Sequence, residues 1–230
     1  MTSGARERRP VGVLALQGSF DLHVRALERL GVEVREVRRR EDLDGIGALI
    51  IPGGESTTMS RLAREYGLLP ELERALAGGL PAFGTCAGAI LLGKGDDRPP
   101  RFGVVDAHVD RNAYGRQVDS FTSPVEVEGL DEPFHGIFIR APRFRVDETA
   151  KVEILGRAGD EPVLIRGGGV WIASFHPELT SDLRIHRAFL ESAGYEFSDA
   201  RASGGTERED RGSGADATQD ATDGRMGRAR

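Results

Sequence analysis

The sequence predicts a three-layer α/β fold, in which a mixed, mostly parallel sheet is flanked by helices. Three observations support this prediction. Short, nearly continuous apolar runs recur along the first half of the chain, as expected for strands buried on both faces of a parallel sheet. Stretches with helical spacing of their apolar residues alternate with these runs. Between residues 101 and 175 the pattern changes to short strands joined by turns, which indicates an antiparallel extension or a mixed sheet edge.

Strands and helices alternate in the first part of the chain. Residues 11–17, VGVLALQ, form the first buried strand. The stretch SFDLHVRALERLG follows with near-helical spacing of its apolar residues and closes at Gly31. VEVREV then alternates like a strand, and GALIIPGG is another buried strand that ends in glycines. This order is typical of an α/β domain.

A longer helical stretch, TTMSRLAREYGLLPELERALAGG, comes next, with a break near Gly67, before the strand LPAFGTC. In the second half we expect further strands within HGIFIRAPRFRV, VEILGRAG and EPVLIRGGGVWIASF. SDLRIHRAFLESAG is predicted to form a final amphipathic helix, with Ser181 or Asp182 as its cap.

We expect one domain over residues 10–198, with a flexible extension at 1–9 and a disordered tail at 199–230. The tail contains no Leu, Ile, Val or aromatic side chain. Such a segment cannot bury enough apolar area to offset the entropy lost on ordering.

Composition excludes several classes of function. The net charge of −6 favours neither nucleic acid nor an anionic membrane as a partner. No apolar run approaches the length of about 20 residues that spans a bilayer, and the basic start MTSGARERRP lacks the apolar stretch of a signal peptide. The single cysteine excludes an internal disulfide, so we expect a reducing, cytoplasmic setting.

That single cysteine, Cys86, lies between Gly84 and Gly88 where a predicted strand runs into a helix. The pattern G-x-C-x-G resembles the nucleophile elbow of hydrolases, with Cys in place of Ser. Glycines are needed there because the turn is tight, and the sulfur then projects from the carboxyl edge of the sheet. A buried structural cysteine explains this stretch equally well when it is taken alone.

A thiol nucleophile needs a base, and the base needs an orienting group. In SFHPELTSD, His176 follows an apolar strand, and strand alternation points Glu178 the same way. A surface turn with a helix-capping acid is the alternative. His23 and His186 lie on predicted helices, where we expect solvated or packed side chains. The two remaining histidines, His108 and His135, receive no role.

The stretch IIPGGESTTM offers backbone N–H groups at the end of a strand. Gly53 and Gly54 permit unusual backbone conformations, including a peptide flip. Together with the amide of Ala87, their amides form a candidate oxyanion hole. A phosphate-binding loop is the rival interpretation, but the stretch lacks G-K-[ST] and Glu55 would repel an anion.

Several stretches taken together closely resemble one family, the glutaminase subunit of pyridoxal 5'-phosphate synthase, which belongs to the triad-type (class I) glutamine amidotransferases. The resemblance covers about residues 11–195 and rests on LALQGSFDLH, PGGESTTM, GTCAGAILL, RNAYGRQVDSF, FIRAP and SFHPELTSDLRIH. It implies the flavodoxin-like fold of that superfamily.

The resemblance also implies roles for individual residues. Cys86 would be the nucleophile, His176 the general base and acid, and Glu178 the group that orients His176. Further positions match the glutamine-contacting residues of the family: Gly54, Glu55, Ser56, Arg111, Ile139 and Arg140. An arginine suits the α-carboxylate of a free amino acid, and a carboxylate suits its α-ammonium. Gln17 matches the family as well, without a chemical role that follows from its type.

The implied activity is hydrolysis of L-glutamine to L-glutamate and ammonia. The ammonia is expected to pass to a docked, barrel-shaped synthase subunit that makes pyridoxal 5'-phosphate, so the coenzyme is a product of the complex and we expect no cofactor or metal in this chain. Two alternatives are a glutaminase subunit of another synthase, such as that making imidazole glycerol phosphate, and a catalytically silent interaction subunit. The RNAYGRQ stretch argues against the first, and the complete triad against the second.

Overall fold

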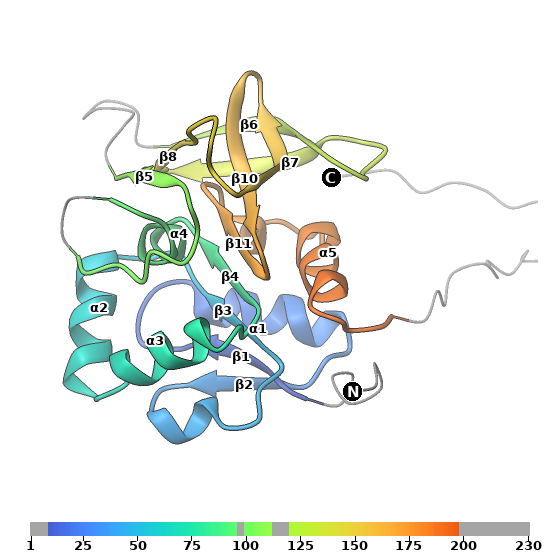
Figure 1. Cartoon of the computed structure of the whole chain (residues 1–230). Coiled ribbons are helices and arrows are strands. Elements are labelled where there is room, and N and C mark those ends of the chain that lie inside the picture. Colours follow the sequence, from blue (N-terminus) through green and yellow to red (C-terminus); the bar gives the residue numbers. More distant parts are fainter. Residues whose placement is uncertain (1–8, 96–98, 112–119, 198–230) are drawn as a thin grey trace, which may run out of the picture. The chain divides into compact units, whose positions relative to one another are not determined.

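A computed structural model describes residues 9–95, 99–111 and 120–197. Its main feature within these residues is a nine-stranded mixed sheet with the order β2-β1-β3-β4-β11-β10-β9-β6-β7 (Figure 1). Helices cover both faces of this sheet, which confirms the predicted three-layer α/β class. The predicted extension at 1–9, apart from Arg9, and the predicted tail at 199–230 lie outside the described residues, so the domain limits stay predictions.

The first half of the sheet is parallel. Neighbouring strands pair in parallel from β2 to β11, and every described strand of this half had been expected from the sequence. All of its strands except β2 consist entirely of buried residues. One of these, β11, comes from much later in the chain than the others. The strands are β1 (Val11–Leu14), β2 (Val34–Val37), β3 (Ala48–Ile51), β4 (Ala82–Thr85) and β11 (Val170–Ala173).

The second half of the sheet is antiparallel, as the change of pattern after residue 101 had indicated. Its strands are β10 (Glu161–Gly167), β9 (Glu153–Ala158), β6 (Ser120–Val127) and β7 (Phe134–Ile139). A separate pair is formed by β5 (His108–Asp110) and β8 (Arg143–Arg145). The strand β6 was not among those expected from the sequence, because it contains Pro124, which lacks the N–H of a strand residue.

The helices are α1 (Phe20–Arg29), α2 (Ser56–Glu65), α3 (Leu69–Ala77), α4 (Ala87–Leu92) and α5 (Arg184–Ser192), with 3-10 turns at Arg40–Leu43 and Pro177–Leu179. The predicted break at Gly67 is confirmed, since this residue has φ +67° between α2 and α3. The predicted cap of the last helix was wrong in position. Leu183 is the N-cap, although Asp182 still accepts the amide of Arg184 at 3.0 Å through its carboxylate.

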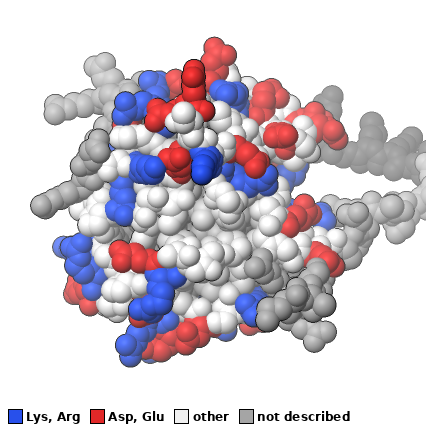
Figure 2. Space-filling view, in the orientation of Figure 1, with Lys and Arg blue, Asp and Glu red and all other residues white. Residues whose placement is uncertain are grey.

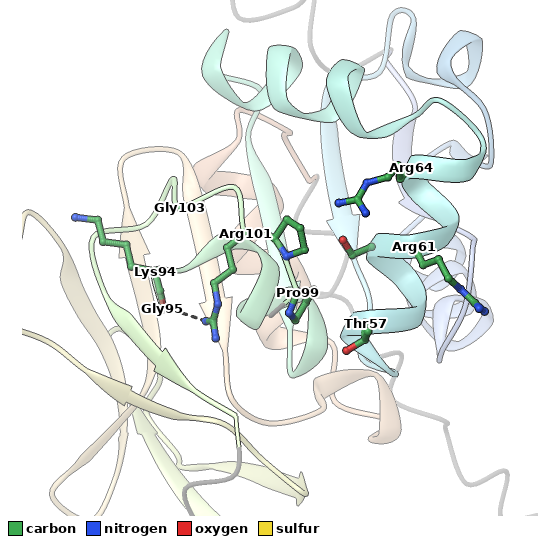
Figure 3. A pocket seen from close by; sticks show the side chains of 10 residues that line it. Thr57, Arg61, Arg64, Lys94, Gly95, Pro99, Arg101 and Gly103 are labelled. Carbon is green, nitrogen blue, oxygen red and sulfur yellow. Dashed lines mark hydrogen bonds between the residues drawn. The ribbon is translucent and has the colours of Figure 1, made fainter. Parts of the chain in front are cut away.

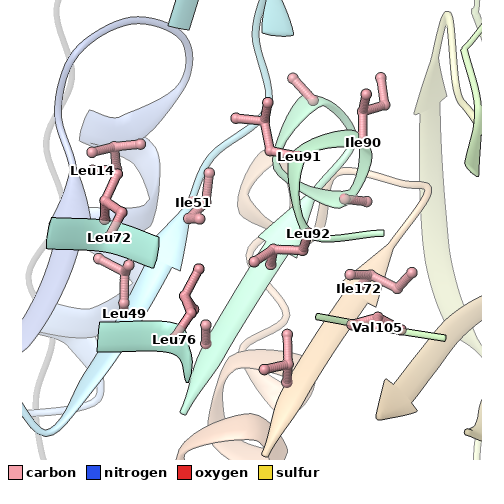
Figure 4. Close-up of a cluster of buried hydrophobic side chains, with 14 of the residues drawn as sticks. Leu14, Leu49, Ile51, Leu72, Leu76, Ile90, Leu91, Leu92, Val105 and Ile172 are labelled. Atoms are coloured by element: carbon pink, nitrogen blue, oxygen red, sulfur yellow. The ribbon is translucent and has the colours of Figure 1, made fainter. Parts of the chain in front are cut away.

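Alternation along the buried strands divides the core between the two faces of the sheet. Leu49 and Ile51 of β3 face α2, α3 and α4, in the cluster drawn in Figure 4. Ala48 and Ile50 of the same strand belong to the cluster that contains residues of α1 and α5. A strand with two buried faces therefore needs no polar position, which explains its continuous apolar sequence.

Figure 2 shows the distribution of charge on one face of the molecule. On the face shown in Figure 2, basic and acidic side chains are interspersed around uncharged areas. None of the helices in the described part of the chain is long and apolar enough to cross a membrane.

Candidate active site

Four parallel strands that are neighbours in the sheet, β1, β3, β4 and β11, end at the same edge. The segments that follow them contain residues singled out in the sequence and, in addition, Ser19. Gln17 and Ser19 follow β1, Gly53 follows β3, Cys86 follows β4 and His176 follows β11. The fold thus gathers at one edge residues that are far apart in the chain, which is where ligands bind in open α/β sheets.

Cys86 forms a strained turn between β4 and α4. Its backbone has φ 48° and ψ −100°, a conformation that costs a non-glycine residue about 1–3 kcal/mol. The flanking glycines have steric reasons. A Cβ on Gly84 would lie 2.6 Å from the carbonyl carbon of Gly88, and one on Gly88 would overlap the carbonyl oxygen of Ile51. Cys86 is 7 % exposed. A cysteine that served packing alone would not need this strained backbone, so the geometry favours the nucleophile elbow.

His176 and Glu178 are hydrogen-bonded to each other in the buried interior of the site. Nδ1 of His176 lies 2.7 Å from Oε1 of Glu178. Strand alternation was the wrong basis for expecting this pairing, because Pro177–Leu179 form a 3-10 turn and not a strand. The turn brings both side chains together through its own curvature.

The histidine ring lies beside Cys86. A Cβ placed on Gly53 would overlap the His176 ring and would lie 3.5 Å from Cβ of Cys86, so both side chains border the same glycine. Nε2 of His176 has no hydrogen-bond partner among the described residues. The thiol of Cys86 is directed to the carbonyl oxygen of Ile139 at 3.8 Å.

Burial and charge act in opposite directions on these groups. Burial by itself lowers the pKa of His176, but its interactions with Cys86 and Glu178 prevail and raise that pKa to about 10. For Glu178, burial acts to raise the pKa, and the histidines His23 and His176 together with the Ser19 hydroxyl lower it to about 2. The pair is therefore an imidazolium and a carboxylate near neutral pH.

Ser19 and His23 lie at the Glu178 carboxylate and His186 lies behind His23, three positions that sequence reasoning had not linked to Glu178. The hydroxyl of Ser19 donates to Oε1 of Glu178 at 2.6 Å. Nε2 of His23 lies 3.4 Å from Oε2, and Nδ1 of His23 lies 2.9 Å from Nε2 of His186. Both of these histidines are fully buried. Of the two states expected from the sequence, solvated or packed, the packed one is therefore correct. Their spacing on amphipathic helices carried no signal that would link them to Glu178.

The glycine loop after β3 is fastened to the loop after β1. The carbonyl of Gly53 accepts a hydrogen bond from the Ser19 amide at 3.1 Å. Gly18 has φ +94°, and a Cβ there would overlap that same carbonyl. Gly54 has φ +155°, in the region that favours glycine. Gln17 Oε1 accepts the amide of Glu55 at 2.7 Å, which gives Gln17 the structural role that its type did not reveal.

The side chain of Glu55 serves the helix that follows it. Its carboxylate accepts hydrogen bonds from the amides of Thr57 and Thr58 and from the Thr58 hydroxyl, and these bonds lower its pKa to about 2. Arg111 lies close, with Nη2 3.5 Å from Oε1 of Glu55. The structure thus brings together the two charges expected to meet the ends of a free amino acid. Ser56, the first residue of α2, is buried.

The other expected substrate positions lie nearby or outside the described residues. Ile139 is 37 % exposed, and its carbonyl contacts Cys86. Arg140 is exposed and has φ 43°, the one strained non-glycine backbone besides Cys86 in the described part of the chain. Ala87 follows Cys86 as the first residue of α4. Residues 112–119 of the RNAYGRQVDSF stretch lie outside the described residues.

A cavity of about 820 Å³ lies elsewhere, between α2 and residues 94–95 and 99–103 (Figure 3). Cys86, His176 and Glu178 are not among the residues that line it. Arg101 is tied into its wall, since it donates to the carbonyls of Lys94 at 3.0 Å and Val109 at 2.8 Å. The described residues include no group of three or more His, Cys, Asp and Glu side chains that could hold a metal ion.

Comparison with known proteins agrees with this geometry. Over most of its length the chain resembles proteins named pyridoxal 5'-phosphate synthase subunit PdxT. It is 60% identical to that of Thermus thermophilus over 188 residues, which is 80% of this chain and 97% of the relative. It is 51% identical to that of Deinococcus radiodurans over 192 residues, with 80% and 97% covered.

Solved structures give the same picture. A crystal structure described as a glutamine amidotransferase is 58% identical, with a TM-score of 0.74 and coverage of 80% of this chain and 98% of that one. PurLQS from Thermotoga maritima, at 18% identity and a TM-score of 0.60, shares the fold.

The model of the SNO glutamine amidotransferase family matches residues 13–194. The chain therefore belongs to the SNO glutamine amidotransferase family.

Proposed function

We propose that this chain hydrolyses L-glutamine to L-glutamate and ammonia, and that it supplies the ammonia to a synthase subunit that makes pyridoxal 5'-phosphate. The observation that supports this most directly is the hydrogen bond of 2.7 Å between His176 and Glu178 beside the strained Cys86. Relatives named as subunits of pyridoxal 5'-phosphate synthase, at up to 60% identity, support the choice of partner.

The first half of the reaction forms a thioester. The sulfur of Cys86 attacks the side-chain amide carbon of glutamine, and the carbonyl oxygen takes up negative charge. The amides of Gly54 and Ala87 are the donors proposed for this oxyanion. His176, protonated through its contact with Glu178, gives its proton to the departing nitrogen, so the C–N bond breaks and ammonia leaves.

The second half releases glutamate. A water molecule attacks the thioester carbon while His176, now neutral, accepts a proton from it. The C–S bond breaks and the sulfur of Cys86 returns to its starting state beside the imidazolium, while the new carboxyl group of glutamate releases the second proton of the water molecule to solvent and becomes a carboxylate. Glu178 keeps the ring oriented and stabilises its charge in both halves.

Substrate recognition is proposed to use the charges beside the triad. Arg111 and Arg140 suit the α-carboxylate of glutamine, and Glu55 suits its α-ammonium. Arg111 and Glu55 now face each other at 3.5 Å. Glutamine bound in the proposed way would therefore come between these two charged side chains. Gly54, Ser56 and Ile139 are assigned to the same substrate contacts.

We expect the activity of this chain to depend on the synthase subunit for two reasons. Ammonia is largely protonated at neutral pH and then is no nucleophile, so it must pass directly to the synthase subunit, for which we propose the shape of a barrel. The thiol of Cys86 is directed at the Ile139 carbonyl, and hydrogen bonds of catalytic groups commonly tighten only in the working complex. We place the complex in the cytoplasm, where a single cysteine stays reduced.

Ammonia release from glutamine, measured with and without the synthase subunit, tests this proposal. We expect the subunit to stimulate release, and we expect Cys86→Ala to abolish it. Ser192→Ala, at the last residue of α5, is a matched control that should behave as the wild type. Absence of ammonia from the wild-type complex would show instead a silent interaction subunit. Stimulation by the imidazole glycerol phosphate synthase subunit alone would redirect the proposal to that partner.

A further inference from the structure

Two buried histidines lie behind the Cys86–His176–Glu178 group. His23 comes from α1 and His186 from α5, and both side chains are fully buried. Nδ1 of His23 lies 2.9 Å from Nε2 of His186, and the rings meet edge to face with centroids 5.1 Å apart. Buried polar groups are costly unless they are paired. The pair therefore needs an explanation beyond the packing of two helices.

The other nitrogen of His23 faces the carboxylate of Glu178. Nε2 of His23 lies 3.2 Å from the Thr85 hydroxyl and 3.4 Å from Oε2 of Glu178. Oε1 of Glu178 is already bonded to Ser19 and His176. Oε2 is buried and makes no regular hydrogen bond with the described residues. His23 is thus placed at the one carboxylate oxygen that is left to satisfy.

The charge of the two rings is set by burial. Burial lowers the pKa of His23 and lowers that of His186 to about 3, although Glu178 acts on both in the opposite direction. Each ring is therefore neutral near neutral pH and has one N–H. The ionisable groups that face them are Glu178 and His176 from the loop after β11, with Asp21 of α1 acting on His23 as well.

Two arrangements of these protons are possible. If His23 donates from Nδ1, its Nε2 lone pair faces the carboxylate, and the Nδ1–H of His186 is buried with no acceptor among the described residues. If His186 donates from Nε2, His23 has its proton on Nε2, directed at Thr85 and Glu178. Only a lone pair of His186 then stays unpaired. The second arrangement avoids both an unpaired buried N–H and a lone pair against a carboxylate.

We propose that His23, fixed in its Nε2–H tautomer by His186, is a positioning residue that holds the Glu178 carboxylate against His176. This proposal rests on the glutaminase function proposed above. The N–H of His23 would stabilise the carboxylate anion and keep Oε1 turned to Nδ1 of His176. The orientation of Nε2 of His176, the nitrogen that faces the reacting atoms, then depends on His23. This residue of α1 contacts neither the substrate nor the sulfur of Cys86.

Two substitutions of His23 separate positioning from packing. Glutamine can place an amide N–H near the position of Nε2, whereas the shorter asparagine places its amide near Nδ1 and withdraws the donor from Glu178. In the complex with the synthase subunit, we expect His23→Asn to lower kcat about tenfold, because the carboxylate loses the N–H that faces its Oε2 at 3.4 Å. KM should stay unchanged, and His23→Gln should restore most of kcat.

The pH profile supplies a readout that packing would not move. Without the N–H donor the Glu178 carboxylate is protonated more readily, so the acid limb of kcat/KM should move to higher pH in His23→Asn and return in His23→Gln. Equal activity of both variants and the wild type would overturn the proposal. So would equal losses in both variants, in step with their melting temperatures and with an unmoved acid limb.

The tautomers can be read without any turnover. In the wild-type protein labelled with ¹⁵N-histidine, we expect NMR spectra at pH 7 to show both His23 and His186 protonated on Nε2 alone. A proton on Nδ1 of His23, or a cationic ring, would overturn the proposal even if His23→Asn did not fold. Failure of the glutaminase function is seen separately, as absence of ammonia from the wild-type complex.

Discussion

Oε1 of Gln17 accepts the backbone amide of Glu55 at 2.7 Å, so a side chain after β1 fixes the glycine loop after β3. That loop includes Gly53 and Gly54, whose peptide forms part of the proposed oxyanion hole. Two segments 38 residues apart in the chain are thereby joined at the edge of the site. The loop geometry depends on this side chain as much as on the glycines.

Replacement of Gln17 by methionine, which has a similar shape but no comparable acceptor, should therefore impair the chemical step. We expect a loss of about tenfold in kcat, because one donor of an oxyanion hole is worth at least that much when it is misplaced. Steady-state ammonia release from the complex measures it. Gln17→Glu keeps an acceptor at the same position and should retain more activity than Gln17→Met; the reverse order would contradict this role.

Glu178 gives the second prediction. Cys86 and Glu178 together raise the pKa of His176 to about 10, and Glu178→Gln keeps the shape of the side chain but removes the contribution of the Glu178 charge. The imidazolium should then lose its proton at lower pH, and kcat should fall on the order of a hundredfold, within the range for general acid–base catalysis. Glu191→Gln, an exposed substitution on α5, is the control. Full activity in Glu178→Gln would exclude the carboxylate from the mechanism.

Much of this site could be predicted from short stretches of sequence. The elbow at Cys86 is a local structure, since Gly84 and Gly88 are needed by contacts within the same turn and with β3. Strands with two buried faces have a continuous apolar sequence, so β3 and β4 were also recognisable. The pairing of His176 with Glu178 was expected too, although a 3-10 turn produces it.

The surroundings of the carboxylate could not be predicted. His23 and His186 lie 163 residues apart, and a histidine on an amphipathic helix has the same local pattern whether it is solvated or buried. Only the packing of α1 and α5 on one face of the sheet brings His23 to Glu178 and His186 to His23. Gln17 was unassigned for a similar reason, because its partner is a backbone amide, which leaves no trace in the sequence.

Acid should destabilise the folded chain through His186. The pKa of this buried ring is about 3 when folded and 6.5 ordinarily, so the unfolded chain binds the extra proton as the pH falls below 6.5. Stability should therefore decrease from pH 6.5 toward pH 5, a range in which Glu178, with a pKa of about 2, stays charged in the folded chain. His186→Gln should reduce this slope by up to about 1.4 kcal/mol per pH unit.

Urea unfolding at several pH values measures that slope. Ser192→Ala, on the same helix, removes no titratable group and should keep the wild-type slope. Because His186→Gln also changes packing, its stability at pH 7 is expected to fall, and the slope rather than the absolute value is the test. A slope identical to that of the wild type would show that His186 is protonated in the folded chain as readily as in the unfolded one.

Gly53→Ala should remove activity without unfolding the protein. The new methyl group would overlap the His176 ring, which is held by its bond to Glu178 and has little room to retreat. A displacement of about 1 Å in a catalytic group can lower the rate on the order of a hundredfold. Gly169→Ala is the matched control, because a Cβ there would meet its nearest neighbour at 3.8 Å. Since Gly53 does not have a positive φ, loss of activity at an unchanged melting temperature would identify the contact with His176, and not backbone strain, as the cause.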